Sequence, residues 1–153
     1  MDLILWRHAE ALELRELGDD LDRALTSKGE RQAQRMAEWL NRHLPAGARV
    51  LASPARRTQQ TAAALERRVK TVAALAPDGS VEGLLAATRW PDAREPVLVV
   101  GHQPTLGLAA AYLLTGHPDP WPLRKGAILW LRRRERDGAA QVLLHAALGV
   151  DLL

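Results

Sequence analysis

The 153-residue chain contains no cysteine. Disulfide bonds, cysteine-ligated metal sites and a cysteine nucleophile are therefore excluded together. The chain also lacks any apolar run close to the roughly 18 residues that a membrane-spanning helix needs, and no basic segment precedes its first apolar stretch. We therefore expect a cytoplasmic protein without a signal peptide and without a membrane partner.

A strong excess of charge of one sign is also missing. The 21 lysines and arginines face 18 aspartates and glutamates, which leaves a formal net charge of +3. Much of this excess lies in Arg132–Arg134, interpreted as a solvated strand end before a turn at Gly138, with a basic docking patch as the alternative. Because the arginines do not cluster with aromatic residues, we expect no nucleic-acid partner.

The remaining composition is that of an ordinary globular protein, with 47% apolar and 25% charged residues. Its length suits one domain over residues 1–153. Apolar segments near 3–6, 50–52 and 97–100 predict short strands, and the last of these is typical of a strand buried on both faces of a parallel sheet. A further strand is expected at 69–73.

Helical patterns lie between and after these strands, at about 29–44, 54–68, 81–88 and 104–114. Residues 127–131 and 141–145 are expected to form a closing hairpin around Asp137-Gly138. The alternation of strands and helices predicts an α/β fold, a single three-layer α/β/α sandwich with a mostly parallel central sheet.

Three of the predicted strands lead directly into polar side chains. Arg7 and His8 follow the first, Ser53 and Arg57 follow the second, and His102 follows the strand at 97–100. Because parallel strands present their carboxyl ends at one edge of a sheet, we expect these side chains to meet there. Arginines can hold phosphoryl oxygens through paired hydrogen bonds. One histidine can attack phosphorus and the other can donate a hydrogen bond to the developing charge, so neither a metal nor another cofactor is required.

These residues fall in four motifs that resemble those of the histidine phosphatase superfamily, the phosphoglycerate-mutase-like proteins. The motifs are Arg7-His8-Ala9-Glu10, Leu25-Thr26-x-x-Gly29-x-x-Gln32-Ala33, Ser53-Pro54-x-x-Arg57-x-x-Gln60-Thr61 and Gly101-His102. Ala9 stands where the family usually has glycine. The resemblance implies that His8 is the nucleophile and that Arg7, Arg57 and His102 form the phosphate pocket.

Three shorter segments resemble the small SixA-type phosphohistidine phosphatases. They are Asp22-Arg23-Ala24-Leu25-Thr26, Leu75-Ala76-Pro77-x-Gly79 and His102-x-Pro104. In this comparison Arg23 becomes a further candidate for the phosphate pocket, with a surface arginine in a loop as the alternative. Glu10 and Ser53, which lie within the motifs, and Gln103, which follows His102, complete the set of candidate substrate-binding residues.

The segment after the Ser53 motif lacks an obvious acid. It contains only Glu66, expected on a solvated turn in the middle of a helix, and Glu82 follows in the next helix. An alkoxide leaving group needs a positioned acid, whereas imidazole, with a pKa near 6.5, can depart neutral. The sequence therefore favours phosphohistidine on a protein as the substrate. Three acids of the first loop could still supply a proton: Glu10, Asp19 and Asp20.

Two other functions are kept as alternatives. The same chemistry could act on a small phosphate ester, or the fold could bind phosphate without catalysis. The pair His8 and His102 argues against the second of these, because a pure binding protein needs no nucleophile. Trp39 and Trp130 are expected in the core, whereas Trp90 and Trp121 are expected in loops, with a docking surface as the alternative. The oligomeric state is left open.

Overall fold

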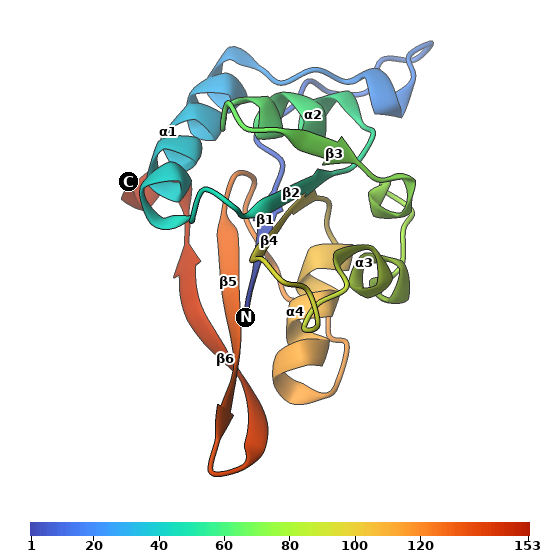
Figure 1. Ribbon diagram of the computed structural model, residues 1–153. Helices are drawn as coiled ribbons and strands as arrows, with labels where there is room; N and C mark the ends of the chain where they lie inside the picture. Colours follow the sequence, from blue (N-terminus) through green and yellow to red (C-terminus); the bar gives the residue numbers. More distant parts are fainter.

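A six-stranded mixed β-sheet runs through the middle of the molecule (Figure 1), in the strand order β3-β2-β4-β1-β5-β6. The computed structural model describes residues 1–153. The strands are β1 (Asp2–Arg7), β2 (Arg49–Ala52), β3 (Val69–Thr71), β4 (Val97–Gly101), β5 (Ile128–Arg136) and β6 (Ala139–Leu148). The first four are mutually parallel, whereas β5 pairs antiparallel with β1 and β6 antiparallel with β5. The predicted mostly parallel α/β sheet is confirmed.

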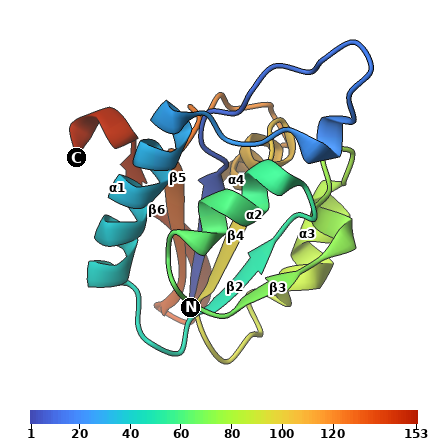
Figure 2. The ribbon, with the colours of Figure 1, turned by 90° about the horizontal axis from the view of Figure 1, so that it is seen from above.

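Helices cover both faces of this sheet. They are α1 (Ser27–His43), α2 (Arg56–Ala63), α3 (Val81–Thr88) and α4 (Thr105–Thr115), with short 3-10 turns η1 (Asp20–Asp22), η2 (Ala73–Leu75) and η3 (Val150–Leu152). In Figure 2, α1 and α2 lie in front of the sheet and α4 lies behind it. None of the helices is both long enough and apolar enough to span a bilayer.

The core is divided into two layers by the alternation of side chains along the central strands. Leu3 and Leu5 of β1 pack with residues of α3 and α4, whereas Ile4 and Trp6 pack with residues of α1 and α2. All four of these side chains are fully buried. This is why the central strands are apolar on both faces, and it completes the three-layer sandwich.

Helix α2 is shorter than expected. It begins at Arg56 rather than Pro54 and ends at Ala63, five residues before Arg68. The chain tightens at this end, because Glu66 N–H donates to the Ala63 carbonyl at 3.1 Å and Glu66 adopts a left-handed φ of 55°. The expectation that Glu66 lies in mid-helix is therefore wrong. After this turn the chain leaves the helix and continues into β3, which lies beside β2.

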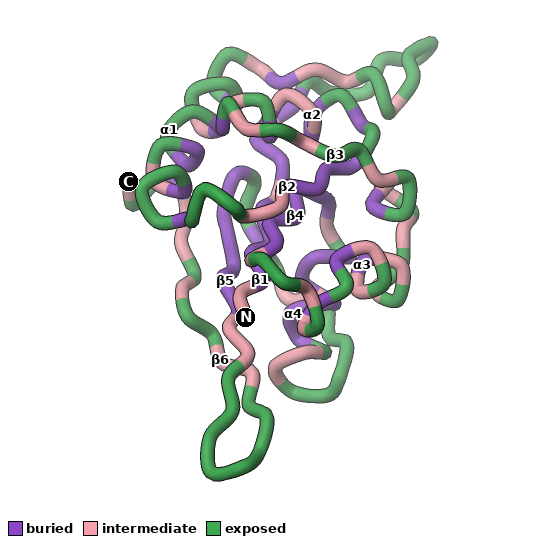
Figure 3. The backbone as a smooth tube through the Cα atoms, in the orientation of Figure 1, coloured by how far each residue is buried: buried purple, intermediate pink, exposed green.

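The closing hairpin is longer than the sequence predicted. Strand β5 continues through Arg132–Arg134, so these arginines lie within the strand rather than at its end. Arg132 donates to both carboxylate oxygens of Asp2, at 2.8 and 2.9 Å, which ties the hairpin to β1. The turn at Asp137 and Gly138 has positive φ at both residues, as a tight hairpin turn requires. Figure 3 shows the far end of the hairpin as exposed.

Trp90 belongs to the core rather than to a loop surface. It is 7% exposed, packs with the α3 and α4 layer and donates its indole N–H to the Met1 carbonyl at 3.2 Å. The alternative of a docking surface at Trp90 is therefore wrong. Trp130 is buried and Trp39 half-buried against the opposite layer, as expected.

Candidate active site

The ends of three neighbouring strands bring the predicted residues together. Arg7 of β1 is in register with Gly101 of β4, and the next main-chain N–H, that of His8, donates to the Gly101 carbonyl at 3.1 Å. On the other side of β4, Ser53 N–H donates to the Val100 carbonyl at 3.2 Å. The rings of His8 and His102 consequently lie with their centroids 5.4 Å apart.

His8 is buried and held in one tautomer. Its Nδ1 lies 2.7 Å from the Ala9 carbonyl oxygen. Because a carbonyl oxygen can only accept, Nδ1 carries the hydrogen and Nε2 keeps its lone pair. Burial is the main cause that lowers the pKa of His8 to about 4; the bond to Ala9 opposes this shift, and nearby positive charges reinforce it. At neutral pH the ring is therefore uncharged and can act as a nucleophile through Nε2.

His102 lies 2.7 Å, through Nε2, from the hydroxyl oxygen of Ser53. That oxygen already accepts the Ala55 N–H at 3.1 Å, so the hydroxyl hydrogen is available to His102. Burial, reinforced by the charge of Arg57, lowers the pKa of His102 to about 3. Ser53 thus positions the second histidine, and its role as a substrate-binding residue stays a prediction.

The two predicted arginines of the cluster come from different elements. Arg57, near the start of α2, is 3% exposed, and its two terminal nitrogens donate to the Asp20 carbonyl at 2.8 Å and the Asp20 carboxylate at 3.2 Å. Arg7 donates to the Leu123 carbonyl at 2.8 Å. Four buried side-chain nitrogens have no hydrogen-bond partner in the protein, and three of them belong to this cluster: Arg7 Nε, Arg57 Nε and His102 Nδ1. The fourth is Trp130 Nε1 in the core. Unpaired buried polar groups are uncommon, and their concentration here indicates a site for an anionic, oxygen-rich ligand.

Asp20, in the turn η1, occupies the guanidinium of Arg57. Its carboxylate also accepts the Nε–H of Arg23 at 3.0 Å, so it lies between two arginines. Burial raises the pKa of Asp20, but the charges and hydrogen bonds of the two arginines outweigh it and hold the pKa below its ordinary value. The Asp20 carboxylate therefore occupies one terminal nitrogen of the Arg57 guanidinium. The sequence indicated Asp20 only as an acid on a loop.

Glu10 and Gln103 have structural partners. The Glu10 carboxylate accepts the Thr26 hydroxyl at 2.7 Å. The Gln103 side chain donates to the Trp121 carbonyl at 2.7 Å and accepts the Gly107 N–H at 2.8 Å. Their role as substrate-binding residues stays a prediction, as does that of Arg23.

The other motif residues position the loop that follows His8. The amide oxygens of Gln32 and Gln60 accept main-chain N–H groups of Glu10, at 2.9 Å, and Leu25, at 2.7 Å. The hydroxyl of Thr61 accepts the Ala9 N–H at 3.0 Å and donates to the Arg57 carbonyl at 2.7 Å. Sequence reasoning gave these three side chains no role, although their place in the motifs was the available signal.

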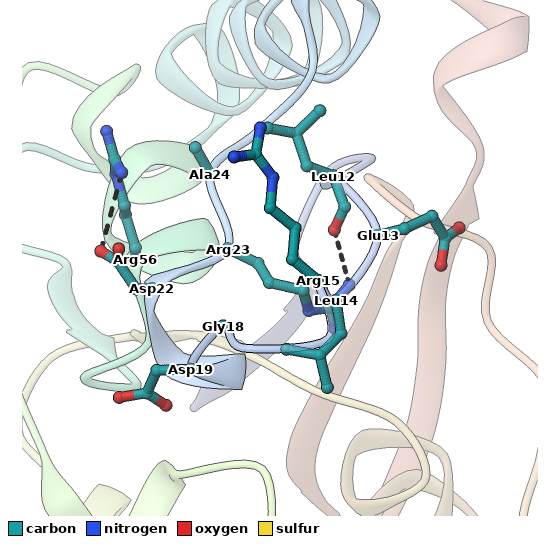
Figure 4. A pocket seen from close by; sticks show the side chains of 10 residues that line it. All are labelled: Leu12, Glu13, Leu14, Arg15, Gly18, Asp19, Asp22, Arg23, Ala24 and Arg56. Carbon is teal, nitrogen blue, oxygen red and sulfur yellow. Dashed lines mark hydrogen bonds and ion pairs between the residues drawn. The ribbon is translucent and has the colours of Figure 1, made fainter.

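A pocket of about 260 Å³ lies beside this cluster, formed within residues 12–24 and closed by Arg56 (Figure 4). Arg23 spans it, because its Nη1 donates to the Leu12 carbonyl at 2.9 Å. Arg56 and Asp22 form an ion pair at 3.6 Å across its side. No three of the histidine, aspartate and glutamate side chains gather in a group that could hold a metal ion.

Comparison with known proteins relates this chain to a family. Residues 3–78 match the histidine phosphatase superfamily (branch 1). An uncharacterised protein of Picosynechococcus is 36% identical over 157 residues, which cover 95% of this chain and 90% of that protein.

Solved structures agree with this assignment. The putative phosphohistidine phosphatase SixA of Nakamurella multipartitia is 30% identical, with a TM-score of 0.78 over 96% of this chain and 94% of that one. A protein histidine phosphatase SixA complexed with tungstate is 26% identical, with a TM-score of 0.78 over 99% of both chains. The chain therefore belongs to the histidine phosphatase superfamily and is a phosphatase of that superfamily.

Proposed function

We propose that this protein removes phosphate from phosphohistidine on another protein, through a covalent intermediate on His8 and without a metal ion. The observation that carries the proposal is the state of His8, which is neutral, with Nδ1–H bound to the Ala9 carbonyl and Nε2 free. Such a ring is ready to attack phosphorus, whereas a binding protein has no use for a free lone pair at this position.

The reaction has two steps. In the first, the lone pair of His8 Nε2 forms a bond to phosphorus while the P–N bond of the substrate breaks. The substrate imidazole leaves as a neutral ring when its other nitrogen carries a hydrogen. In the second, water attacks phosphorus and the bond to Nε2 breaks, which returns neutral His8 and inorganic phosphate. Arg7 and Arg57 hold the phosphoryl oxygens, and His102 donates to the charge that develops on them.

The preference for a P–N bond rests on the state of Asp20. This carboxylate contacts the cluster, and the two arginines around it keep it ionised, so it is a poor proton donor. An imidazole leaving group needs no donor, whereas an alkoxide does. The names of the SixA relatives support the same substrate class. The tungstate bound by one of them supports a phosphoryl site in general, because tungstate is a tetrahedral oxyanion like phosphate.

A small phosphate ester is the second candidate. The pocket of about 260 Å³ beside Arg23 favours it, because it offers room for a compact leaving group next to the phosphate position. An activity panel separates the two. We expect kcat/KM to be highest for a phosphohistidine peptide, intermediate for activated aryl phosphates and lowest for a sugar phosphate, by roughly 10²–10⁴-fold at the extremes. Efficient hydrolysis of the sugar phosphate would favour the second candidate.

The variant His8→Ala tests the mechanism. We expect loss of turnover with retention of the folded state, and no covalent label after incubation of this variant with a radioactive phosphohistidine peptide. The unsubstituted protein should carry an acid-labile label on His8, and a chelator should leave its activity unchanged. Turnover by His8→Ala, or a label on another residue, would overturn the assignment of His8 as nucleophile.

A further inference from the structure

A second, strongly basic pocket of about 340 Å³ lies beside the candidate active site. Five exposed cationic side chains line it: Lys28, Arg31 and Arg35 from α1, and Arg124 and Lys125 from the segment before β5. The one acidic side chain that lines it is Asp151, which pairs with Arg124 at 3.3 Å. Both members of this pair are largely exposed, and ion pairs of this kind are weak. Arg35 donates to the main-chain oxygen of Leu153, so the excess positive charge of the pocket lies mainly on Lys28, Arg31 and Lys125.

Three of these cations have no partner of opposite charge. Lys28, Arg31 and Lys125 take part in none of the ion pairs of the structure. Lys28 also lies in the first turn of α1, where the helix dipole favours acidic side chains. The dipole therefore does not favour a cation at Lys28, and all three unpaired cations can pair with an external anion.

The pocket and the active site share a border. The N–H of Gly126, next to Lys125, donates to the main-chain oxygens of Arg7 and His8 at 3.1 and 3.0 Å. The charge of Lys125 is among those that lower the pKa of His8. Gln32 lines the pocket and holds the Glu10 N–H. A molecule seated on the basic pocket is thus next to the loop that carries the nucleophile.

We propose that the basic pocket docks an acidic segment, rich in aspartate or glutamate, of the protein that carries the phosphohistidine. This inference rests on the proposed function. The cations are exposed and spread over two elements, an arrangement that suits several carboxylates along an extended surface. Charge complementarity of this kind mainly raises the rate of encounter and selects among partners.

The test compares two synthetic peptides with the same phosphohistidine, one flanked by four glutamates and the other by four glutamines. At low ionic strength we expect kcat/KM to be at least tenfold higher for the acidic peptide, and added salt should reduce the difference. The variant Lys28→Glu/Arg31→Glu should abolish the difference while leaving hydrolysis of a small aryl phosphate unchanged. The matched control is Arg134→Glu/Arg136→Glu, which makes the same change in net charge on the distant part of β5 and should retain the preference.

Direct binding separates this inference from the proposed function. A fluorescent decamer of glutamate without phosphohistidine should bind the unsubstituted protein and the β5 control, but bind the Lys28→Glu/Arg31→Glu variant at least tenfold more weakly. Failure to hydrolyse either phosphohistidine peptide would overturn the proposed function, while this binding result would still decide on the pocket. Equal binding by all three proteins, or inhibition of decamer binding by micromolar inorganic phosphate, would overturn the acidic-segment proposal, the latter in favour of a small-anion site.

Discussion

At the scale of single residues, the site is built from side chains that are buried without being fully hydrogen-bonded. His8, Arg57 and His102 are 6%, 3% and 4% exposed, yet Arg57 Nε and His102 Nδ1 have no partner. Leaving a buried donor unpaired costs about 1–3 kcal/mol, so a fold tolerates it where a ligand completes the bond. The residues that lack partners here are the ones that we propose as ligands of the phosphoryl group.

Arg57→Lys should be nearly as damaging as Arg57→Ala. Lysine keeps the positive charge but loses the planar fork that can bind two phosphoryl oxygens, so we expect kcat/KM to fall by about 10²-fold or more in both variants. Arg56→Lys, at the exposed neighbouring position of α2, is the matched control and should retain most of the activity. Steady-state kinetics with an aryl phosphate measure all three. A rate for the Arg57→Lys variant close to that of the unsubstituted protein would mean that Arg57 acts only as a point charge.

Asp20→Asn should improve access to the arginines. The substitution removes a charge that would compete with phosphate for Arg57. The Arg57 side chain is buried but that of Asp20 is 41% exposed, so solvent screens the pair and its contribution is about 1 kcal/mol. The inhibition constant for inorganic phosphate should therefore fall by roughly fivefold. Turnover of a phosphohistidine peptide should persist. If Asp20 instead donates the proton, the rate with alkyl phosphates should drop by about 10²–10⁴-fold.

At the scale of elements, the loop between β1 and α1 is held in place by close approach as well as by hydrogen bonds. Gly29, in the first turn of α1, lies against the Glu10 carbonyl so closely that a Cβ atom would stand 2.0 Å from that oxygen. Only glycine permits this contact. The Thr26 hydroxyl caps α1 by accepting the Gly29 N–H at 2.9 Å, which fixes the same point of the loop from the other side.

Gly29→Ala should therefore lower both stability and activity without touching substrate. The loop or the helix must shift to accept the methyl group, at a cost of about 1–3 kcal/mol in the free energy of unfolding. Urea denaturation and kcat/KM measure the two effects. Gly47→Ala is the control, because a Cβ at Gly47 meets nothing within 4 Å, and it should be neutral. Similar behaviour of the two variants would contradict the close-contact argument.

At the scale of the whole molecule, burial of two neutral histidines links stability to pH. The pKa of His8 is lowered from 6.5 to about 4 and that of His102 to about 3. Between these values and 6.5, the unfolded chain binds more protons than the folded one, so stability rises with pH over this window and is lost as the pH falls through it. One pKa unit corresponds to about 1.4 kcal/mol. Protonation of the two rings at low pH therefore lowers the free energy of unfolding by an amount on the order of several kcal/mol.

The free energy of unfolding, measured by urea titration from pH 7 down to pH 4, should therefore decline, and His102→Gln should flatten the decline. The value of kcat/KM should change little between pH 5 and pH 7, because His8 is already neutral over this range. A rise of kcat/KM with a midpoint near pH 6.5 would show that the nucleophile titrates as an ordinary exposed histidine.

The α/β fold and the convergence of Arg7, His8 and His102 could be predicted from the amino-acid sequence alone. These residues follow strands whose apolar patterns are local and strong, and parallel strands must place their carboxyl ends at one edge. The position of Arg57 could be predicted in the same way, because its spacing from Ser53 places it near the start of the following helix.

Four features became known only from the folded structure: the position of Asp20 on Arg57, the end of α2 before Glu66, the burial of Trp90 and the gathering of Lys28, Arg31 and Lys125. All of these except the end of α2, which is a local turn at Glu66, depend on contacts between segments far apart in the chain. The loop at 12–24 also has no periodic pattern from which its path could be predicted. The hydrophobic periodicity that predicts helices and strands depends on residues close together in the sequence. The partner of a loop side chain depends instead on how whole helices and strands pack together.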